Sequence, residues 1–239
     1  MFYKEFGDKD AHSIVFLHSA IFVDVFYRLY RMQHDYHIIV PHINGNGEEI
    51  KAEYSHTNAA LDINCFIQSF LNKKVTAVGN ELGSDLLLQI AIKSPRYFDK
   101  LVLINPTLLC SQEEKNKQSK KNTLNKCRTF TCLKGRLNGL RGSVLNDYVE
   151  YAVNMSKENV KSMFKINPLC YDILESISLL NIPTLILYGD ENRAVTMTSE
   201  LLNKLIPNSI IKIIKGKNIA ITKSGEIQRL ITEFIEDNG

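Results

Sequence analysis

The stretch from Val75 to Gly83 reads Val-Thr-Ala-Val-Gly-Asn-Glu-Leu-Gly and constrains the fold more than any other part of this chain. Its short, valine-rich apolar run predicts a buried strand, and the residues after Gly83 have the pattern of a helix. Glycine at positions 79 and 83 allows a sharp turn between these two elements. Such a turn raises the side chain of Glu81 above the end of the sheet.

Short β-branched runs alternate with amphipathic stretches along most of the chain. Strands are expected at residues 13–17, 37–41, 75–78, 101–105, 184–188 and 210–214, and helices at residues 22–32, 58–71, 82–93, 197–205 and 225–235. Strands that alternate with helices predict βαβ units. The fold class is therefore α/β, with a mostly parallel sheet covered by helices on both faces.

One long segment interrupts this alternation. Residues 107–181 contain no strand-like run, although a strong strand is expected on either side. The segment begins polar and basic, and it becomes helical at residues 146–154, 157–166 and 171–180. We interpret it as a helical cap inserted into a core domain formed by residues 1–106 and 182–239.

Positive charge is concentrated in this cap. The chain has a net charge of only +3, yet nine Lys or Arg and no Asp or Glu occur between Lys115 and Arg141. This basic region, residues 115–141, forms a solvated surface or attracts an anionic substrate, an acidic partner or a membrane surface. No interleaved aromatic residues or base-reading motif accompany it, so nucleic acid is not an expected partner.

The sequence has no pattern typical of a disulfide framework, a metal or nucleotide site, or a membrane span. The five cysteines have irregular spacing and are expected to be free thiols. There is no metal-ligand cluster, no Walker A motif and no G-x-G-x-x-G, so no metal or cofactor is predicted. No apolar run reaches the roughly 18 residues of a membrane span, and the N-terminus lacks a signal-type apolar core, so we expect a cytoplasmic protein.

Six short motifs occur in the order typical of one large superfamily. They are His18-Ser19-Ala20, residues 42–47 (His-Ile-Asn-Gly-Asn-Gly), residues 79–83, residues 101–106 (Leu-Val-Leu-Ile-Asn-Pro), residues 182–190 (Ile-Pro-Thr-Leu-Ile-Leu-Tyr-Gly-Asp) and residues 215–218 (Lys-Gly-Lys-Asn). Together they resemble the α/β-hydrolase superfamily over nearly the whole chain. The resemblance implies an α/β-hydrolase fold with residues 79–83 as the nucleophile elbow. It also places the oxyanion-hole donors at the backbone N–H groups of Ala20 and Leu82.

The catalytic triad of that superfamily is missing. At the three positions that match the nucleophile, the acid and the histidine, this chain has Glu81, Asn192 and Asn218. All six histidines precede residue 57, so no shift of the motifs supplies a late histidine. Because Ser-His-Asp chemistry requires a base beside the nucleophile, ordinary serine-hydrolase activity is not expected.

Three roles remain open for Glu81. It can act as a nucleophile that forms an ester, or as a general base with His18 as its acid or electrostatic partner. Alternatively, its carboxylate fills the oxyanion hole and the site is catalytically silent. The helix dipole favours the ionised carboxylate and a dry pocket favours the neutral acid, so the sequence leaves its protonation undetermined.

These roles lead to three functional hypotheses. The first is a triad-less protein that binds a small apolar or acyl-type ligand between core and cap, with little or no esterase activity. The second is a hydrolase or lyase with non-standard chemistry that uses Glu81 as base or nucleophile together with His18. The third is a protein-interaction module that acts through the basic cap. The sequence does not determine the oligomeric state.

Overall fold

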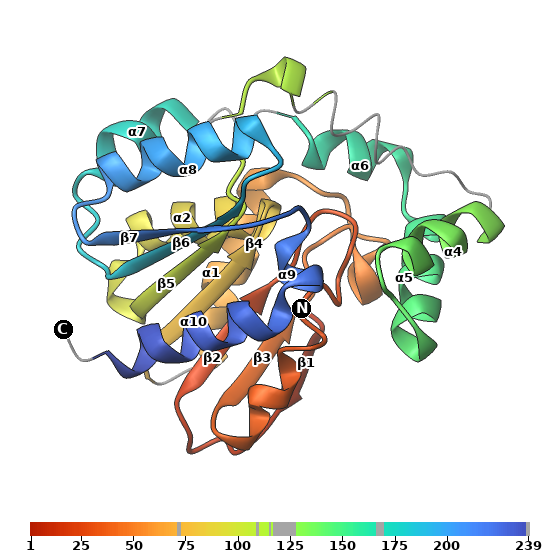
Figure 1. Cartoon of the computed structure of the whole chain (residues 1–239), viewed down its shortest axis with the longest axis horizontal. Helices are drawn as coiled ribbons and strands as arrows, with labels where there is room; N and C mark the ends of the chain where they lie inside the picture. Colours follow the sequence, from red (N-terminus) through yellow and green to blue (C-terminus); the bar gives the residue numbers. More distant parts are fainter. Residues whose placement is uncertain (71–72, 109, 115, 117–127, 166–169, 238–239) are drawn as a thin grey trace.

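A seven-stranded sheet forms the centre of the computed structural model, which describes the chain except for residues 71–72, 109, 115, 117–127, 166–169 and 238–239 (Figure 1). The strands are β1 (Tyr3–Phe6), β2 (Ser13–Leu17), β3 (His37–Pro41), β4 (Val75–Asn80), β5 (Phe98–Ile104), β6 (Thr184–Gly189) and β7 (Ser209–Ile214). Their order is β1-β3-β2-β4-β5-β6-β7, and only the pairing of β1 with β3 is antiparallel. The six predicted strands are confirmed, whereas β1 had no counterpart in the prediction.

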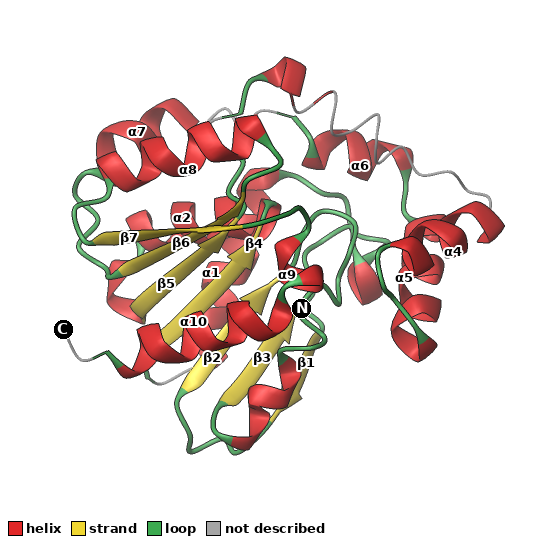
Figure 2. Ribbon diagram, in the orientation of Figure 1, coloured by secondary structure: helices red, strands yellow, loops and turns green. Residues whose placement is uncertain are grey.

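Helices surround the sheet, as the ribbon diagram shows (Figure 2). They include α1 (His56–Phe70), α2 (Leu82–Lys93), α4 (Arg128–Leu137), α5 (Gly142–Asn154), α6 (Lys157–Met163), α7 (Cys170–Ile177), α8 (Arg193–Leu205), α9 (Ile219–Thr222) and α10 (Ser224–Glu236), with short 3-10 helices η1 (Tyr30–His34), η2 (Gly47–Glu49) and η3 (Pro95–Tyr97). The mostly parallel sheet with helices on both faces is therefore the architecture predicted from the sequence.

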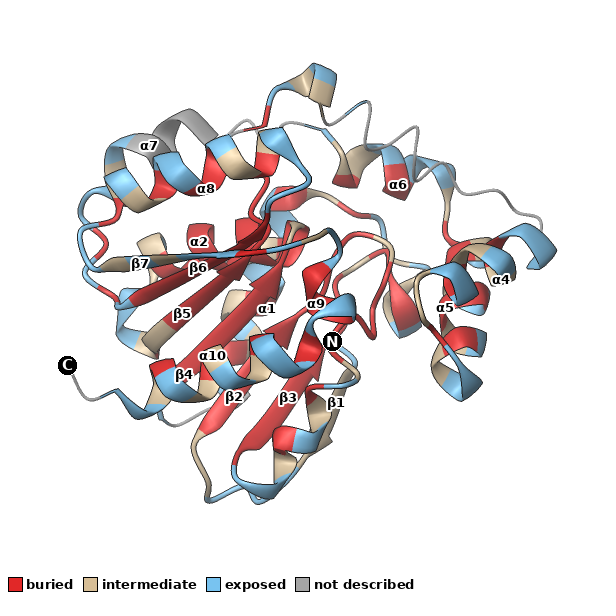
Figure 3. Cartoon of the chain, viewed as in Figure 1, coloured by how far each residue is buried: buried red, intermediate tan, exposed pale blue. Residues whose placement is uncertain are grey.

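Two apolar clusters, one on each face of the sheet, hold these layers together. Adjacent residues of a strand point to opposite faces, so Ile14 and Phe16 join one cluster while Val15 and Leu17 join the other. The cluster that contains Val15 also contains residues of α1, α2, α7 and α8, and the other contains residues of α9 and α10. The five inner strands, β2 to β6, are buried along almost their whole length (Figure 3), which explains their continuous apolar sequences, whereas the edge strands β1 and β7 are mostly partly buried or exposed.

The helix predicted at residues 22–32 is wrong. Successive turns with i to i+3 hydrogen bonds occupy this segment, for example from the Leu29 N–H to the Phe26 carbonyl (2.7 Å), and they end in η1. Six of the eight residues from Phe22 to Leu29 are buried, and Asp24 among them binds the Lys4 ammonium (2.7 Å). When a segment is buried on several sides, packing against neighbouring elements can override its helical propensity.

Residues 107–181, predicted to form a cap and called the cap segment below, connect β5 to β6. The segment contains α5, α6 and α7 near the predicted positions, and also α4, which lies in the basic stretch where no particular helix was predicted. The helix α7 contacts α2 in the layer that covers the sheet, whereas α4 packs on α5. Most of the basic region before Arg128 and the end of the helix predicted at 157–166 lie outside the described residues.

The cysteines and the lengths of the helices can be compared with the prediction in the residues that the structure describes. Cys65 and Cys132 are free thiols in this part of the chain. Among the helices that the structure describes, each is too short or too polar to cross a bilayer.

Candidate functional site

Glu81 lies in a sharp turn between β4 and α2, as the sequence predicted. Its backbone has φ 51° and ψ −111°, a conformation that costs a residue with a side chain about 1–3 kcal/mol. The turn is possible because both flanking glycines meet backbone at close range: a methyl group at Gly79 would lie 2.4 Å from the Ser84 nitrogen, and one at Gly83 would lie 2.0 Å from the Leu17 carbonyl oxygen. The Glu81 N–H donates to the Ile104 carbonyl (2.8 Å), which ties the turn to β5.

Two side chains of α2 fasten this turn to its neighbours. Ser84 is fully buried, and its hydroxyl lies 2.7 Å from the Gly79 carbonyl oxygen while it accepts the Ile104 N–H (3.0 Å). Asp85 accepts the N–H and the hydroxyl of Thr107 (2.8 and 2.6 Å), so it holds the first residues of the cap segment against the elbow. Ser84 is therefore a structural residue. Because backbone groups of β4 and β5 bind its hydroxyl, it does not take the place of the nucleophile that is missing at position 81.

A cavity of about 130 Å³ opens above the elbow. Its walls come from the loop after β2, the elbow, the cap segment and the residues that follow β7. Its lining includes Ala20, Asn80, Glu81, Lys134, Tyr148 and Asn218. Segments far apart in the sequence therefore meet around the Glu81 carboxyl group.

The Glu81 side chain is half-buried in this cavity. Burial raises the pKa of its carboxyl to about 7, and the negative charge of Asp85, one helical turn away, adds to the rise. In the described part of the chain, its carboxyl oxygens accept no hydrogen bond from the start of α2 and form no ion pair. Near neutral pH the group therefore exists as a mixture of neutral acid and carboxylate that faces the cavity.

The structure does not place the carboxylate in the predicted oxyanion hole. The N–H groups of Ala20 and Leu82 donate to no acceptor among the described residues, and Glu81 is not bonded to either of them. Ala20 lines the cavity, while Leu82 is buried beside it as the first residue of α2. The reading in which Glu81 fills its own oxyanion hole therefore has no support in the geometry.

His18 does not form the predicted pair with Glu81. Its Nδ1 donates to the Ser19 carbonyl (2.7 Å) and its Nε2 accepts the Ile43 N–H (3.0 Å), so both ring nitrogens are used by the backbone. The ring is fully buried, which lowers its pKa to about 4 and keeps it neutral. His18 is also absent from the cavity lining, so its role here is to hold two loops together.

The other two triad-equivalent positions are separated by the fold. Asn218 adopts a left-handed conformation (φ 49°, ψ 42°), lines the cavity and donates from Nδ2 to Oδ1 of Asn138 (3.2 Å). Asn192 is exposed at the start of α8 and does not line the cavity. Asp190 accepts the Gly216 N–H (2.8 Å) and thereby connects the loop after β6 to the loop after β7. None of the six histidines lines the cavity.

Sequence reasoning missed the residues that the cap contributes. Lys134 and Tyr148 line the cavity from α4 and α5, and burial lowers the pKa of the Lys134 ammonium. Asn80 was visible in the elbow motif but was given no role; it is buried, and its Oδ1 has no partner among the described residues. No local pattern distinguishes Lys134 from the other basic residues near it, so only the packing of the cap reveals its position.

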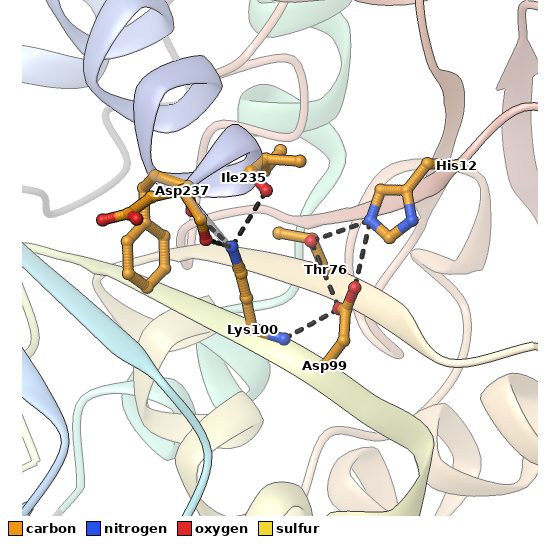
Figure 4. A network of polar contacts seen from close by, with 7 residues as sticks. His12, Thr76, Asp99, Lys100, Ile235 and Asp237 are labelled. Atoms are coloured by element: carbon orange, nitrogen blue, oxygen red, sulfur yellow. Dashed lines mark hydrogen bonds and ion pairs between the residues drawn. The ribbon is translucent and has the colours of Figure 1, made fainter. Parts of the chain in front are cut away.

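A hydroxyl–imidazole–carboxylate group does occur near the starts of the central strands β4 and β5, but it is not a catalytic set (Figure 4). The Thr76 hydroxyl and the Asp99 carboxylate both contact the same nitrogen of His12, Nε2, at 2.9 and 3.3 Å. A proton relay requires the two partners on different ring nitrogens, and Thr76 is fully buried. The neighbouring Lys100 ammonium holds the end of α10 by its carbonyl groups, including Ile235 (2.9 Å), so this network is structural.

In the described residues, no three His, Cys, Asp or Glu side chains gather in a way that could hold a metal ion. The site is therefore lined by one carboxyl-bearing residue, one lysine, three asparagines, Ser19, Tyr148 and apolar residues. This set of groups can bind a small ligand and exchange a proton with it through Glu81.

Comparison with known proteins identifies the fold. No family model matches the chain, and no characterised protein matches it by sequence. Solved structures do match: MenH from S. aureus (17% identity, 98% of each chain, TM-score 0.76) and an enol-lactonase from Burkholderia xenovorans LB400 (13% identity, 99% of this chain and 96% of that one, TM-score 0.79). A putative lipase from Acinetobacter baumannii matches at 19% identity over 98% of this chain and 86% of that one, with a TM-score of 0.80. The chain has the α/β-hydrolase fold that these proteins share.

Proposed function

We propose that this α/β-hydrolase-fold protein binds a small apolar or acyl-type ligand between the sheet and the cap segment and has little or no ordinary esterase activity. The observation that supports it most is the state of Glu81: a carboxyl group occupies the elbow, faces a cavity, and has no hydrogen bond among the described residues. With no histidine in the cavity lining, the site lacks the base that ester hydrolysis by the usual route requires.

The size and lining of the cavity favour a short ligand. An engineered apolar cavity of about 150 Å³ holds a benzene molecule, so about 130 Å³ accommodates a short acyl chain or a small ring. Side chains such as Phe22 and Ile221 supply apolar walls, and the polar groups are few. This combination of apolar walls with a small number of fixed polar groups is typical of small-molecule sites.

The protonated Glu81 carboxyl would donate a hydrogen bond to the carbonyl or carboxylate oxygen of such a ligand. The N–H of Ala20 and the amides of Asn80 and Asn218 supply further donors around it. When Glu81 is ionised, its carboxylate can no longer donate a hydrogen bond to the ligand, and it repels an anionic ligand. We therefore infer that anionic acyl ligands bind more tightly below pH 7 than above it.

Binding of butanoate and hexanoate at about pH 6 and about pH 8 tests this function. The wild type is expected to bind about tenfold more tightly at the lower pH, because the neutral fraction of a group with a pKa of about 7 changes by that factor. In Glu81→Gln the amide remains a donor at both pH values, so this dependence disappears. Isothermal titration calorimetry or ligand-observed NMR measures both proteins.

Glu200→Gln, which changes an exposed carboxylate on α8, is the matched control and retains the pH dependence of the wild type. Equal affinity of the wild type at both pH values would contradict the role of Glu81. An absence of binding to either acid by the folded wild type would contradict the ligand class.

The second candidate function is an enzyme that uses Glu81 as a general base or nucleophile. The observation in its favour is a pKa of about 7, which suits a base that works near neutral pH. His18 is unavailable as the partner in such a reaction because the backbone occupies both of its ring nitrogens. Hydrolysis of an ester formed on Glu81 would thus need another group to activate water.

Hydrolysis of short- and medium-chain p-nitrophenyl esters separates the two candidates. We expect wild type and Glu81→Gln to give the same rate, equal to that of buffer, because no imidazole is available for acyl transfer. Turnover by the wild type that is lost in Glu81→Gln, with the variant still folded, would support the enzyme and refute the proposed binding protein without esterase activity.

A further inference from the structure

The outward face of α4 carries an exposed apolar stripe. Phe130, Leu133 and Leu137 are 52%, 55% and 80% exposed, and their spacing of three and four residues places them on one side of the helix. The opposite side packs on α5 through the buried residues Thr131 and Gly135; a methyl group at Gly135 would lie 2.5 Å from Leu145. The stripe therefore does not contribute to the core.

Basic side chains border this stripe on both sides. Lys134 directly follows Leu133 and Arg136 directly precedes Leu137, so by helical geometry they lie at opposite borders of the stripe. Arg141 follows at the end of the turn after α4, and no acidic residue occurs from Lys115 to Arg141. Arg136 and Arg141 are exposed, so their alkyl parts can lie beside the apolar residues while their charges reach outward, whereas Lys134 lines the cavity.

We propose that this face of α4 binds the surface of an anionic lipid bilayer. An apolar stripe with Lys and Arg at its borders is the pattern of helices that lie in the membrane interface, where apolar groups enter the lipid and cations contact anionic headgroups. Ile210 and Ile213 are also exposed and have Lys212 and Lys215 close by in the sequence, but they lie on the edge strand β7 and not on an amphipathic helix. An acidic protein would satisfy the cations but would not require the apolar stripe between them.

The position of α4 relative to the cavity agrees with this surface. Lys134 borders the stripe and also lines the cavity, so the helix connects the two. A membrane-bound protein would thus hold its cavity close to the lipid, where acyl compounds concentrate. This link depends on the proposed function, whereas the membrane surface itself does not.

Co-sedimentation with vesicles tests the proposal. The full chain is mixed with vesicles of phosphatidylcholine that contain about 30 mol% phosphatidylserine, and with vesicles of phosphatidylcholine alone. We expect binding to the anionic vesicles that weakens as salt is raised, and binding at least about tenfold weaker to the neutral ones. Leu133→Ser combined with Leu137→Ser is expected to reduce binding by about tenfold or more, because both apolar anchors are removed.

Two matched variants separate this surface from general stickiness. Leu179→Ser removes a leucine that is also 80% exposed but lies outside α4, and it is expected to bind as the wild type does. Arg136→Gln is expected to weaken binding to anionic vesicles by roughly fivefold, while Lys212→Gln on β7 leaves it unchanged. Circular dichroism and thermal unfolding establish that each variant is folded.

Three results would overturn the proposal: no binding to anionic vesicles, equal binding to both kinds of vesicle, or an equal loss in Leu179→Ser. Binding to polyglutamate without binding to vesicles would assign the surface to an acidic protein instead. Glu81→Gln is expected to bind vesicles normally, so failure of the ligand site and failure of the membrane surface give different results.

Discussion

Glu81→Gln is expected to stabilise the folded protein by about 3 kcal/mol at about pH 8 and to change its stability little at about pH 4. The folded state raises the pKa of this carboxyl from 4.5 to about 7, so between these values the folded chain binds more protons than the unfolded chain. Wild-type stability attributable to this group is therefore fully present below pH 4.5 and is lost as the pH rises through 7. Glutamine does not ionise and avoids that loss.

Urea unfolding at a series of pH values measures this difference as a shift in the transition midpoint. Glu200→Gln serves as the control for the loss of one negative charge, since its side chain is exposed on α8. A stabilisation of Glu81→Gln that is the same at both ends of the pH range would rule out ionisation as its cause. A destabilisation at about pH 8 would indicate that the carboxylate has favourable contacts in solution.

Gly83→Ala is expected to destabilise the protein by more than about 3 kcal/mol or to prevent folding. The added methyl group would lie 2.0 Å from the Leu17 carbonyl oxygen and 2.7 Å from that of His18. Both neighbours are backbone atoms of β2 and the loop after it, so neither can rotate away as a side chain could. Relief requires α2 to move away from the sheet, which would also displace Glu81 and open the cavity.

Gly225→Ala is the matched control for this substitution. Gly225 lies in the first turn of α10, and the nearest atom to an added methyl group is Nη2 of Arg31 at 3.9 Å. Alanine favours helix over glycine, so this variant is expected to gain roughly 0.5–1 kcal/mol. Chemical denaturation of both variants measures the contrast, and a Gly83→Ala protein as stable as the wild type would refute the close packing of the elbow.

The strands could be predicted from the sequence because their signal is local. In a parallel sheet buried on both faces, runs such as Leu101 to Ile104 must be apolar at every position. The segment from Phe22 to Leu29 is also rich in apolar residues, yet it forms turns, since its side chains fill space between elements that are distant in the sequence. The short strand β1 was missed because its partner β3 lies about 35 residues away and its own pattern is brief.

In the candidate site, too, some features could be predicted from the sequence and others depend on tertiary packing. The elbow motif predicted the turn at Glu81, and the structure has its positive φ there. The proposed partnership with His18 failed because a loop histidine near the elbow is not obliged to point toward it; two backbone groups satisfy the ring instead. Lys134 and Tyr148 reach the cavity only through the packing of α4 on α5.

Two facts about this protein follow from the sequence by itself: a carboxyl group stands at the elbow, and no histidine occurs after His56. These facts depend only on residue identity and order, so they hold whatever the packing. The tertiary structure decided that Glu81 faces a cavity without an internal partner, that its pKa lies near 7, and that His18 is neutral and occupied. Desolvation and hydrogen bonding depend on groups brought together from distant parts of the chain, so only the folded arrangement determines them.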